Sequence, residues 1–303
     1  MFYFNKFSLL LLLYSPLLST SNPCTVTQFS QVAQAVNDCT NLIISNLVVP
    51  GGQTLKLHLR HGATVTFEGT TVFEVAHWEG PLIEFTGEKV LVQGASGSIL
   101  NAQGEKYWDG HGGSGGVTKP RFVQISTTGG SVFKNIHLKN CALFCVGIRA
   151  NDLTISGWTI DSHEGRKKGR NTDGFGIAAG NNIHIENSSV DNQDDCIVVN
   201  GGTNMVFNGI KCAGSHGLSF SAGMQKDGIY INQDYGDEGN THRDFQITNL
   251  KVSNVEGSIH GKGARGVHIV CNDNKCANWQ WSNIKISGGA KDYCNFHPTG
   301  FNC

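Results

Sequence analysis

Three carboxylates and a histidine recur at nearly regular intervals in the middle of the chain. The step from Asp173 to Asp194 nearly equals the step from Asp194 to His216, and Asp195 adds a second carboxylate beside Asp194. If the chain repeats with that period, these side chains stack on successive turns of one structure. Carboxylates held so close repel one another, which raises the pKa of at least one of them. A carboxylic acid with a raised pKa beside ionised partners is suited to hydrolysis of a glycosidic bond.

A short sequence repeat, with a period of about 21 residues, runs through the region that contains these acids. Each unit has an apolar pair, a central Asn or Gly, and a second alternating segment; the central residues are Asn135, Gly157, Asn187, Gly209, Asn249 and Asn283. A second strand lies between these segments, around Ile148, Ile177, Ile197 and Leu218. The units are too short for a helix between parallel strands, which excludes a βαβ fold.

Such short units predict an all-β solenoid, specifically a right-handed parallel β-helix. The 303 residues include 39 glycines and only 6 prolines, which favours many short strands joined by tight turns. The amphipathic segment 27–39 predicts a short N-terminal helix that caps the first coil. We expect residues 22–303 to form a single domain.

The N-terminal residues are typical of a secretory signal peptide, which we place at residues 1–21. Lys6 supplies the positive charge, an apolar run opens at Leu9, and small residues precede position 22. The apolar run is shorter than the ~18–20 residues that span a membrane. The net charge of −1 gives no global field for nucleic acid or a membrane surface. We therefore expect a secreted, extracellular monomer.

The ten cysteines fall mostly into close sequence pairs. In an exported protein such spacing indicates local disulfides rather than a metal site. No C-x-x-C pair with partner histidines is present, so a structural zinc site is not expected. The expected disulfides are Cys24–Cys39, Cys196–Cys212, Cys271–Cys276 and Cys294–Cys303, with Cys141 and Cys145 as a fifth close pair.

Three short motifs carry a resemblance to a known family. NTDGF at 171–175, DNQDDC at 191–196 and SHG at 215–217 resemble three of the four signature motifs of glycoside hydrolase family 28, the polygalacturonases. The similarity extends through most of the chain after residue 21. Segment 106–122 resembles a loop on an early coil, and segment 271–289 resembles the C-terminal coil.

The resemblance implies a mechanism and a set of site residues. Asp194 would be the general acid, while Asp173 and Asp195 would position and activate the water, with inversion at the anomeric carbon. His216 would support the acid and contact the sugar. The substrate would be the α-1,4-linked galacturonan of pectin, and no metal or other cofactor is expected. The residues that would line the sugar subsite are Asn171 and Gln193.

The chain departs from the family pattern at three points. Gly176 stands where the first motif normally ends in Asp, and Ser215 stands where a Gly normally precedes the histidine. The fourth motif, Arg-Ile-Lys on the coil after the histidine, is absent. Because that Arg/Lys pair would hold a substrate carboxylate, another cation has to replace it for tight binding. The candidates are Arg166, Lys167, Lys168 and Arg170 in the basic run 163–170, and then Arg243, Lys262 and Arg265.

The repeat breaks shortly after the histidine. The strand around Ile229 follows the strand around Leu218 after only about half of the expected period. In the family, about two further coils lie here and carry the Arg-Ile-Lys motif. We interpret the break as a loss of roughly 50 residues between Gly223 and Lys226. This interpretation predicts a continuous β-helix with a local irregularity near 223–228.

The leading hypothesis is a secreted polygalacturonase whose activity is reduced or lost because the Arg-Ile-Lys motif is absent. A non-catalytic galacturonan-binding protein is the first alternative; the missing Arg/Lys pair favours it and the intact acids argue against it. A pectate lyase is a second alternative, which requires calcium-binding carboxylates and a basic proton abstractor. The motif spacing gives the lyase no support. In a further alternative, the aspartates are solvated turn residues without a shared role.

Overall fold

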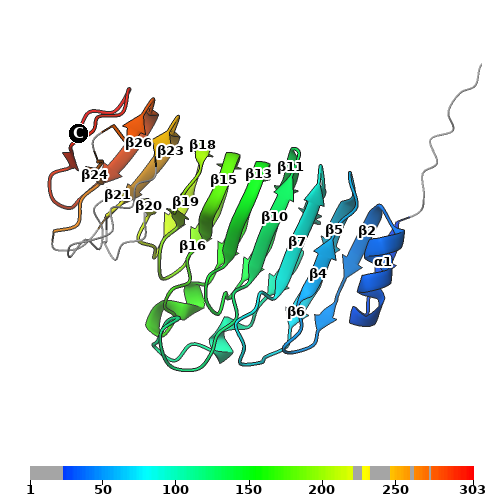
Figure 1. The fold of residues 1–303 in the computed structure, drawn as a ribbon. Helices are drawn as coiled ribbons and strands as arrows, with labels where there is room; N and C mark the ends of the chain where they lie inside the picture. The colour runs from blue at the N-terminus through cyan, green and yellow to red at the C-terminus, as the bar shows by residue number, and fades with distance from the viewer. Residues whose placement is uncertain (1–22, 221–226, 233–245, 260–262, 273) are drawn as a thin grey trace, which may run out of the picture.

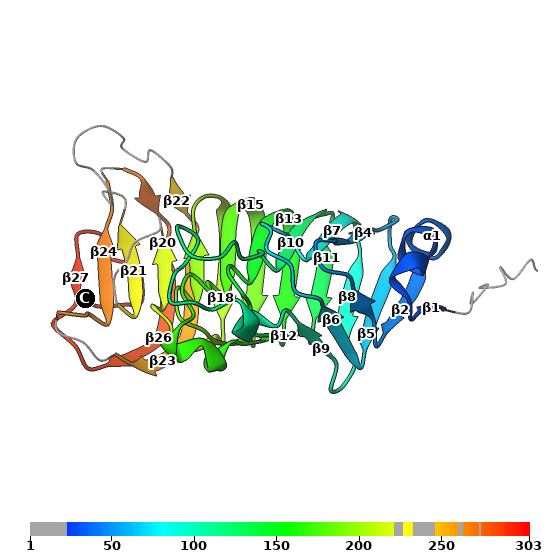
Figure 2. The ribbon, with the colours of Figure 1, turned by 90° about the horizontal axis from the view of Figure 1, so that it is seen from below.

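The chain folds into a long stack of parallel strands, described in a computed structural model over residues 23–220, 227–232, 246–259, 263–272 and 274–303. Figure 1 shows the strands following one another along a single axis, and Figure 2 shows the same stack from below. The strand pairings are parallel throughout the described part. This architecture is the predicted right-handed parallel β-helix.

The largest sheet covers two faces of the stack, which we call the front and back faces. The front face contains β4 (Leu55–His58), β7 (Ile83–Glu88), β10 (Val123–Thr128), β17 (Ile197–Val199), β20 (Leu218–Phe220), β21 (Ile229–Asn232), β24 (Val267–Val270) and β27 (Tyr293–Cys294). The back face contains β1 (Cys24–Val26), β2 (Asn41–Ser45), β5 (Thr64–Glu68), β8 (Leu91–Gly94), β11 (Ser131–Lys134), β18 (Thr203–Asn208), β23 (Lys251–Ser258) and β26 (Gln280–Ser287). Two long strands, β13 (Val146–Ser156) and β15 (Phe175–Glu186), contribute to both faces.

A second sheet forms the third face of the stack. It contains β3 (Val48–Val49), β6 (Thr70–Phe73), β9 (Ile99–Asn101), β12 (His137–Lys139), β14 (Thr159–Asp161), β16 (Ser189–Asp191) and β19 (Lys211–Ala213). A small separate sheet pairs β22 (Ile247–Thr248) with β25 (Cys276–Ala277). In the described part of the chain, three short 3-10 helices lie in the connections: η1 (Phe29–Gln31), η2 (Gly104–Lys106) and η3 (His163–Lys167).

The predicted N-terminal cap is present. The helix α1 (Val32–Asp38) follows η1 and lies at the N-terminal end of the stack (Figure 1). Its buried residues, Val32 and Val36, cover the apolar end of the first coil. None of the helices in the described ranges is long and apolar enough to cross a membrane. The predicted signal peptide, residues 1–21, lies outside the described residues.

Five of the six central residues of the repeat lie at one corner of the coils, as the sequence predicts, and the assignment of the sixth, Asn249, is wrong. Asn254 takes that place, in line with Asn283, while Asn249 lies at another corner, where its Nδ2 donates to Asn204 Oδ1 at 3.1 Å. All six central Asn and Gly residues of the repeat have positive φ, between 50° at Asn187 and 66° at Gly157. Only Gly and, less readily, Asn adopt this left-handed conformation without a large steric cost. The Asn side chains also stack, since Asn283 Nδ2 donates to Asn254 Oδ1 at 2.9 Å. The repeat is therefore set by backbone geometry at its turns.

The interior is a continuous apolar core with a row of aromatic rings along the axis. Phe85, Phe133, Trp158 and Phe175 contact one another in sequence, with centroid separations of 5.2, 6.5 and 5.8 Å. Trp158 is 1% exposed, and its Nε1 donates to the Phe133 carbonyl at 3.2 Å. Such buried aromatic contacts hold neighbouring layers in a fixed register. That register positions the segment before Phe175, which contains Asp173.

All five cysteine pairs form disulfides. The four expected bridges are present, and the fifth joins Cys141 to Cys145. The bridge between Cys196 and Cys212 links the residue after Asp195 to β19. It therefore anchors the acidic segment to the third face of the same coil.

The layers of the two larger faces do not match after β19. On the front face, β17 pairs with β20 and β20 pairs with β21, with Leu218 opposite Ile229. On the back face, β18 pairs directly with β23, with Asn208 opposite Ser253, 45 residues later. Counting only described residues, the front face thus has one strand more than the back face over this stretch. Figure 2 shows β20, β21, β24 and β27 continuing the front face without interruption.

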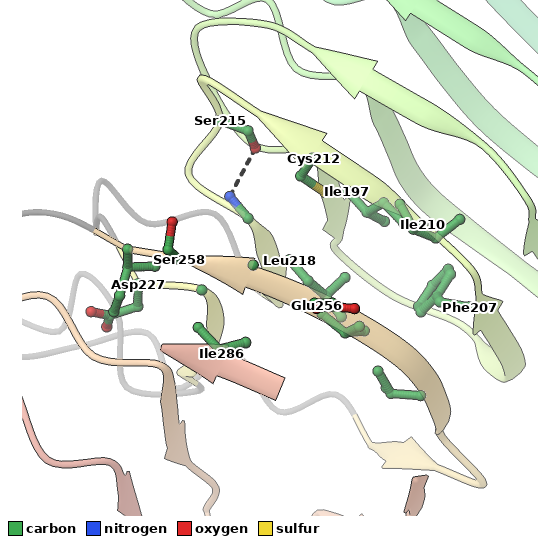
Figure 3. Close-up of a pocket in the computed structure, with 16 residues that line it drawn as sticks. Ile197, Phe207, Ile210, Cys212, Ser215, Leu218, Asp227, Glu256, Ser258 and Ile286 are labelled. Carbon is green, nitrogen blue, oxygen red and sulfur yellow. Dashed lines mark hydrogen bonds between the residues drawn. The ribbon is translucent and has the colours of Figure 1, made fainter. Parts of the chain in front are cut away.

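This mismatch supports the predicted break in the repeat, although residues 221–226 lie outside the described ranges. It leaves a mainly apolar cavity of about 100 Å³ between β20 and β23, shown in Figure 3. Leu218, Ile210 and Phe207 lie on one side and Ile286 on the other. A complete layer would place its own apolar side chains in such a space.

Candidate active site

Asp173, Asp195 and His216 hold equivalent places on three consecutive layers of the front face. Each lies two residues before a strand residue, and these strand residues pair in register: Phe175 with Ile197, and Ile197 with Leu218. Neighbouring layers in a sheet are about 4.8 Å apart. The structure therefore brings these three side chains together.

The sequence spacing placed Asp194 in this column, and the structure corrects that assignment. Phe175 of β15 pairs with Ile197 of β17, so the step between these layers is one residue longer than the step from Asp173 to Asp194. Asp195 is therefore in line with Asp173, and Asp194 precedes the column by one residue. The hydrogen bond from His216 N to the Asp194 carbonyl, at 2.9 Å, extends the same register into the loops.

Asp194 keeps part of its carboxylate accessible while its orientation is fixed. Its side chain is 20% exposed. Oδ2 accepts a hydrogen bond from Asn171 Nδ2 at 3.1 Å, and Oδ1 accepts one from Asp195 N at 2.9 Å. The Nδ1 atom of His216 lies 3.4 Å from Oδ1. Asp194 is thus held by its neighbours in a position from which it can reach a ligand.

The other two carboxyls bind protons unusually tightly. The pKa of Asp195 is raised to about 7, mainly by burial. The hydrogen bond from Ser219 lowers this pKa, and the charge of Asp194 contributes to the rise. Ser219 Oγ donates to Asp195 Oδ1 at 2.6 Å. Burial also raises the pKa of Asp173 well above its usual range, and the charges of Asp194 and Asp195 add to that effect. The group can therefore hold a proton near neutral pH, as an acid catalyst requires.

One oxygen or nitrogen atom from each of Asp194, Asp195 and His216 lies within 4.8 Å of the others. Over the described residues this is the group close enough to share a cation. Because the carboxyls of Asp173 and Asp195 have raised pKa values, protons can balance the same charge. The arrangement is suited to proton transfer at a bond placed over the cluster.

The two predicted subsite residues have different surroundings. Asn171 connects Asp194 to the glycine-rich loop before β10, because its Oδ1 also accepts from Gly113 N at 3.2 Å. The amide of Gln193 points away from that loop, toward η3. Its Nε2 donates to the Ser162 carbonyl at 2.7 Å, and its Oε1 accepts from Thr172 Oγ1 at 3.0 Å. Gln193 therefore fixes the loop that carries the basic run.

Most of the proposed replacement cations are engaged elsewhere or lie outside the description. The guanidinium of Arg166 forms two hydrogen bonds with the Asp191 carboxylate, at 3.0 and 2.7 Å. Arg170 donates to the Gly169 carbonyl, and Arg265 donates to the Lys291 carbonyl. Lys167 and Lys168 are exposed. The two remaining candidates, Arg243 and Lys262, lie outside the described residues.

Sequence reasoning missed three residues that support the cluster. Ser219 lies in an apolar strand 24 residues after Asp195, so no motif joins the two. Asn192 is fully buried, and its Nδ2 donates to the carbonyls of Thr172 and Asp195, both at 2.8 Å. Asp109 pairs with buried Lys119 at 2.9 Å and closes the loop that contacts Asn171. The burial of Ser219, Asn192 and the Lys119 partner of Asp109 identifies them, and the sequence does not display that burial.

The pKa of Asp195 predicts a pH-dependent stability. An ordinary Asp has a pKa near 3.9, so the folded state binds this proton more tightly than the unfolded chain. The stability that results is fully present below about pH 4 and is lost as the pH rises through about 7. The difference corresponds to about 4 kcal/mol at most. Asp195→Asn, which cannot ionise, should reduce the loss.

Urea unfolding at pH 4.5 and pH 7.5 measures this effect. The free energy of unfolding should fall more steeply with pH in the wild type than in Asp195→Asn. Asp173 contributes in the same direction, so part of the pH dependence should remain. Asp152→Asn at an exposed corner serves as the matched control. An identical pH dependence in wild type and Asp195→Asn would refute the assignment.

Comparison with known proteins agrees with the geometry. The profile of the glycosyl hydrolases family 28 matches residues 39–227 and 222–303. This chain belongs to glycosyl hydrolase family 28. It is 37% identical to a polygalacturonase of Phaedon cochleariae, over 92% of this chain and 93% of that relative. It is 34% identical to a probable endopolygalacturonase I of Aspergillus flavus, over 95% and 94% of the two chains.

A solved family 28 structure shares the fold. The endopolygalacturonase I from Stereum purpureum, complexed with two galacturonate, superposes with a TM-score of 0.73 at 27% identity, over 90% of this chain and 96% of that chain. The polygalacturonase from Erwinia carotovora ssp. carotovora shares the fold with a TM-score of 0.52 at 16% identity, over 92% and 84% of the two chains.

The family comparison also locates the break in the repeat. The family profile matches in two parts that meet at residues 222–227. The alignment with the Phaedon cochleariae relative extends over 341 residues, although it covers only 92% of a chain of 303 residues. Because the alignment is longer than this whole chain, many of its positions face gaps here. The relative is therefore longer than this chain over the aligned region, as the break in the repeat predicts.

Proposed function

We propose that this chain hydrolyses α-1,4-galacturonosyl linkages of polygalacturonan by general acid–base catalysis with inversion. The observation that carries the proposal is the stacking of Asp173, Asp195 and His216 on consecutive layers, with Asp194 beside them. This cluster supplies a proton donor and carboxylates from adjacent layers. The polygalacturonase names of its relatives support the substrate class.

Asp194 is the proposed general acid, because its carboxyl is oriented and still accessible. It protonates the glycosidic oxygen as the bond to the anomeric carbon breaks. Asp173 and Asp195 position a water, and whichever of the two is ionised accepts its proton as the water attacks the opposite face of that carbon. His216, 3.4 Å from Asp194, stabilises the charge that remains on the acid. The cluster thus donates one proton to the glycosidic oxygen and accepts one proton from the attacking water.

Two further proposals follow from the cysteines and the continuous stack. We propose that residues 1–21 direct secretion and that residues 22–303 act extracellularly as one monomeric domain. The five disulfides support this location, because such bonds persist in oxidising compartments. The single apolar core that extends through the described layers supports one domain.

We propose that turnover is weaker than in relatives with the Arg-Ile-Lys motif. The layer stacked on the histidine's strand is β21, with the sequence Tyr230-Ile231-Asn232. Strand alternation directs Tyr230 and Asn232 to the same face, with buried Ile231 toward the core. A neutral pair therefore occupies the positions of the motif's Arg and Lys. This observation also favours the alternative of a galacturonan-binding protein without turnover.

The stereochemistry of the first product tests the proposal. Proton NMR during hydrolysis of an oligogalacturonate should show the inverted anomer at the new reducing end before mutarotation equilibrates it. Retention would rule out the water-activation roles of Asp173 and Asp195. Unsaturated products would instead indicate a lyase, which membership in a hydrolase family already disfavours.

A further inference from the structure

A groove lies on the front face, on the β10 side of the acid cluster. It encloses about 350 Å³ and ends at Asp173. Its floor crosses four adjacent strands, where Gln124, Gly147, Gly176 and Val198 occupy one column of paired positions. The two central positions have no side chain. The floor of the groove therefore lies at the level of the backbone over two layers.

The backbone does not require glycine at either central position. Neither Gly147 nor Gly176 has a positive φ. A Cβ atom on Gly176 would find its nearest neighbour, the Val146 carbonyl oxygen, at 3.4 Å, which is ordinary contact. At Gly147 the nearest atom would be the movable end of Gln124, at 2.8 Å. These glycines leave the groove open without serving a turn or a close backbone approach.

Two arginines line this groove, Arg121 and Arg149. Both side chains are exposed. Arg60, Arg166, Arg170 and Arg265 all donate to carbonyl or carboxylate oxygens. Within the described ranges, no hydrogen bond or ion pair involves the guanidinium of Arg121 or Arg149. Each of these two retains its five N–H donors for a ligand.

The two arginines lie close to the acid cluster in the strand register. Arg121 precedes Val123 by two residues, as Asp173 precedes Phe175, and Phe144 holds the equivalent place between them. Arg149 lies on β13, one layer from β15. Phe144, Arg121 and Arg149 line one groove with Asp173. A sugar bound over the groove can thus contact an aromatic side chain, a cation and the end of the cluster.

We propose that this groove binds a galacturonate unit adjacent to the cleaved bond, with its carboxylate held by Arg121 and Arg149. The inference deepens the proposed function, but binding itself needs no turnover. A guanidinium forms paired hydrogen bonds with a carboxylate and stays charged at every relevant pH. The groove supplies cations on one side of the cluster, while β21 presents a neutral pair on the other side.

The glycine at 176 fits a groove for an anion. An acidic side chain at position 176 would place a negative charge on the floor of the groove. Gly176 removes that charge from the layer directly next to Arg149 and Gly147. A substrate carboxylate over this floor meets two guanidinium groups and no fixed carboxylate at position 176. The departure from the motif and the free arginines therefore act in the same direction.

Calorimetric titration with trigalacturonate in an Asp194→Asn background tests the inference without hydrolysis. Arg121→Gln and Arg149→Gln should each weaken binding by about tenfold, and the double variant by up to about a hundredfold. The salt dependence of binding should also become shallower. The fully methyl-esterified trimer should bind all variants equally. Arg60→Gln, at an exposed arginine on another part of the stack, is the matched control.

Unchanged affinity for trigalacturonate in the double variant would overturn the inference. Equal weakening for the methyl ester would also overturn it, since the arginines would then not recognise a carboxylate. The outcome is separable from the proposed function. Loss of binding in the double variant of a protein without turnover would sustain the inference and refute the hydrolase. Turnover whose KM is unaffected by both substitutions would support the hydrolase and refute the inference.

Discussion

Asp194→Asn should lower kcat on polygalacturonate by about a thousandfold, within the range typical of a lost general acid. The amide keeps the size of the side chain, and its single oxygen can keep one of the two hydrogen bonds, from Asn171 Nδ2 or from the Asp195 amide. It cannot donate an acidic proton to the glycosidic oxygen. The loss should therefore fall on kcat, while KM changes little. Steady-state release of reducing ends measures both constants.

The matched control for this variant is Asp152→Asn. Asp152 is an exposed corner residue with φ of 53°, a conformation that Asn also tolerates. The control should keep full activity and an unchanged thermal midpoint. Asp194→Asn should bind oligogalacturonate as the wild type does. An active Asp194→Asn protein would assign the acid to another member of the cluster, with Asp195 the first to examine because of its raised pKa.

Tyr230→Arg combined with Asn232→Lys should raise kcat/KM on polygalacturonate by about tenfold or more, because each new cation forms a charge-assisted hydrogen bond with a substrate carboxylate. The pair restores Arg-Ile-Lys on β21, which stacks directly on the histidine's strand. The gain should vanish on methyl-esterified substrate and shrink at high salt. Initial rates at low substrate concentration measure it directly.

Tyr230 is only 2% exposed and its ring lies 5.2 Å from that of His268, so the substitution also removes packing. Tyr230→Gln with Asn232→Gln is the matched control, since it removes the same aromatic ring and lengthens the second side chain without adding charge. Thermal unfolding of both doubles separates lost stability from altered catalysis. If both folded doubles have wild-type kcat/KM, the neutral pair on β21 does not limit turnover.

The sequence predicts much of this fold because the fold is repetitive at the level of single residues. Six Asn and Gly residues mark corners with positive φ, and five of them were identifiable from their central place in a repeat. The sixth, Asn249, belongs to a different corner, because the strand register places Asn254 in line with Asn283. The cysteine pairs were identifiable because each bridge closes a short loop, with a sequence separation from 4 for Cys141–Cys145 to 16 for Cys196–Cys212. Features that depend on residues close together in the chain can be recognised from the sequence alone.

The site was predicted less completely because it depends on register and burial. Counting residues placed Asp194 in the column of Asp173, but the strand pairing of Phe175 with Ile197 selects Asp195 instead. Ser219 and Asn192 were missed because they act across layers, through hydrogen bonds to residues on other coils. Arg121 and Arg149 were missed because they occur in no motif, and only the groove brings them together.

Reducing-end release from de-esterified polygalacturonate, in the presence of EDTA, tests the central claim most directly. The comparison is between purified wild type and Asp194→Asn at mildly acidic pH, where the raised pKa values leave the cluster partly protonated. The account predicts steady release by the wild type and at least a hundredfold less by the variant. Equal absence of release from two proteins that both bind pectate would contradict hydrolysis and leave a galacturonan-binding protein.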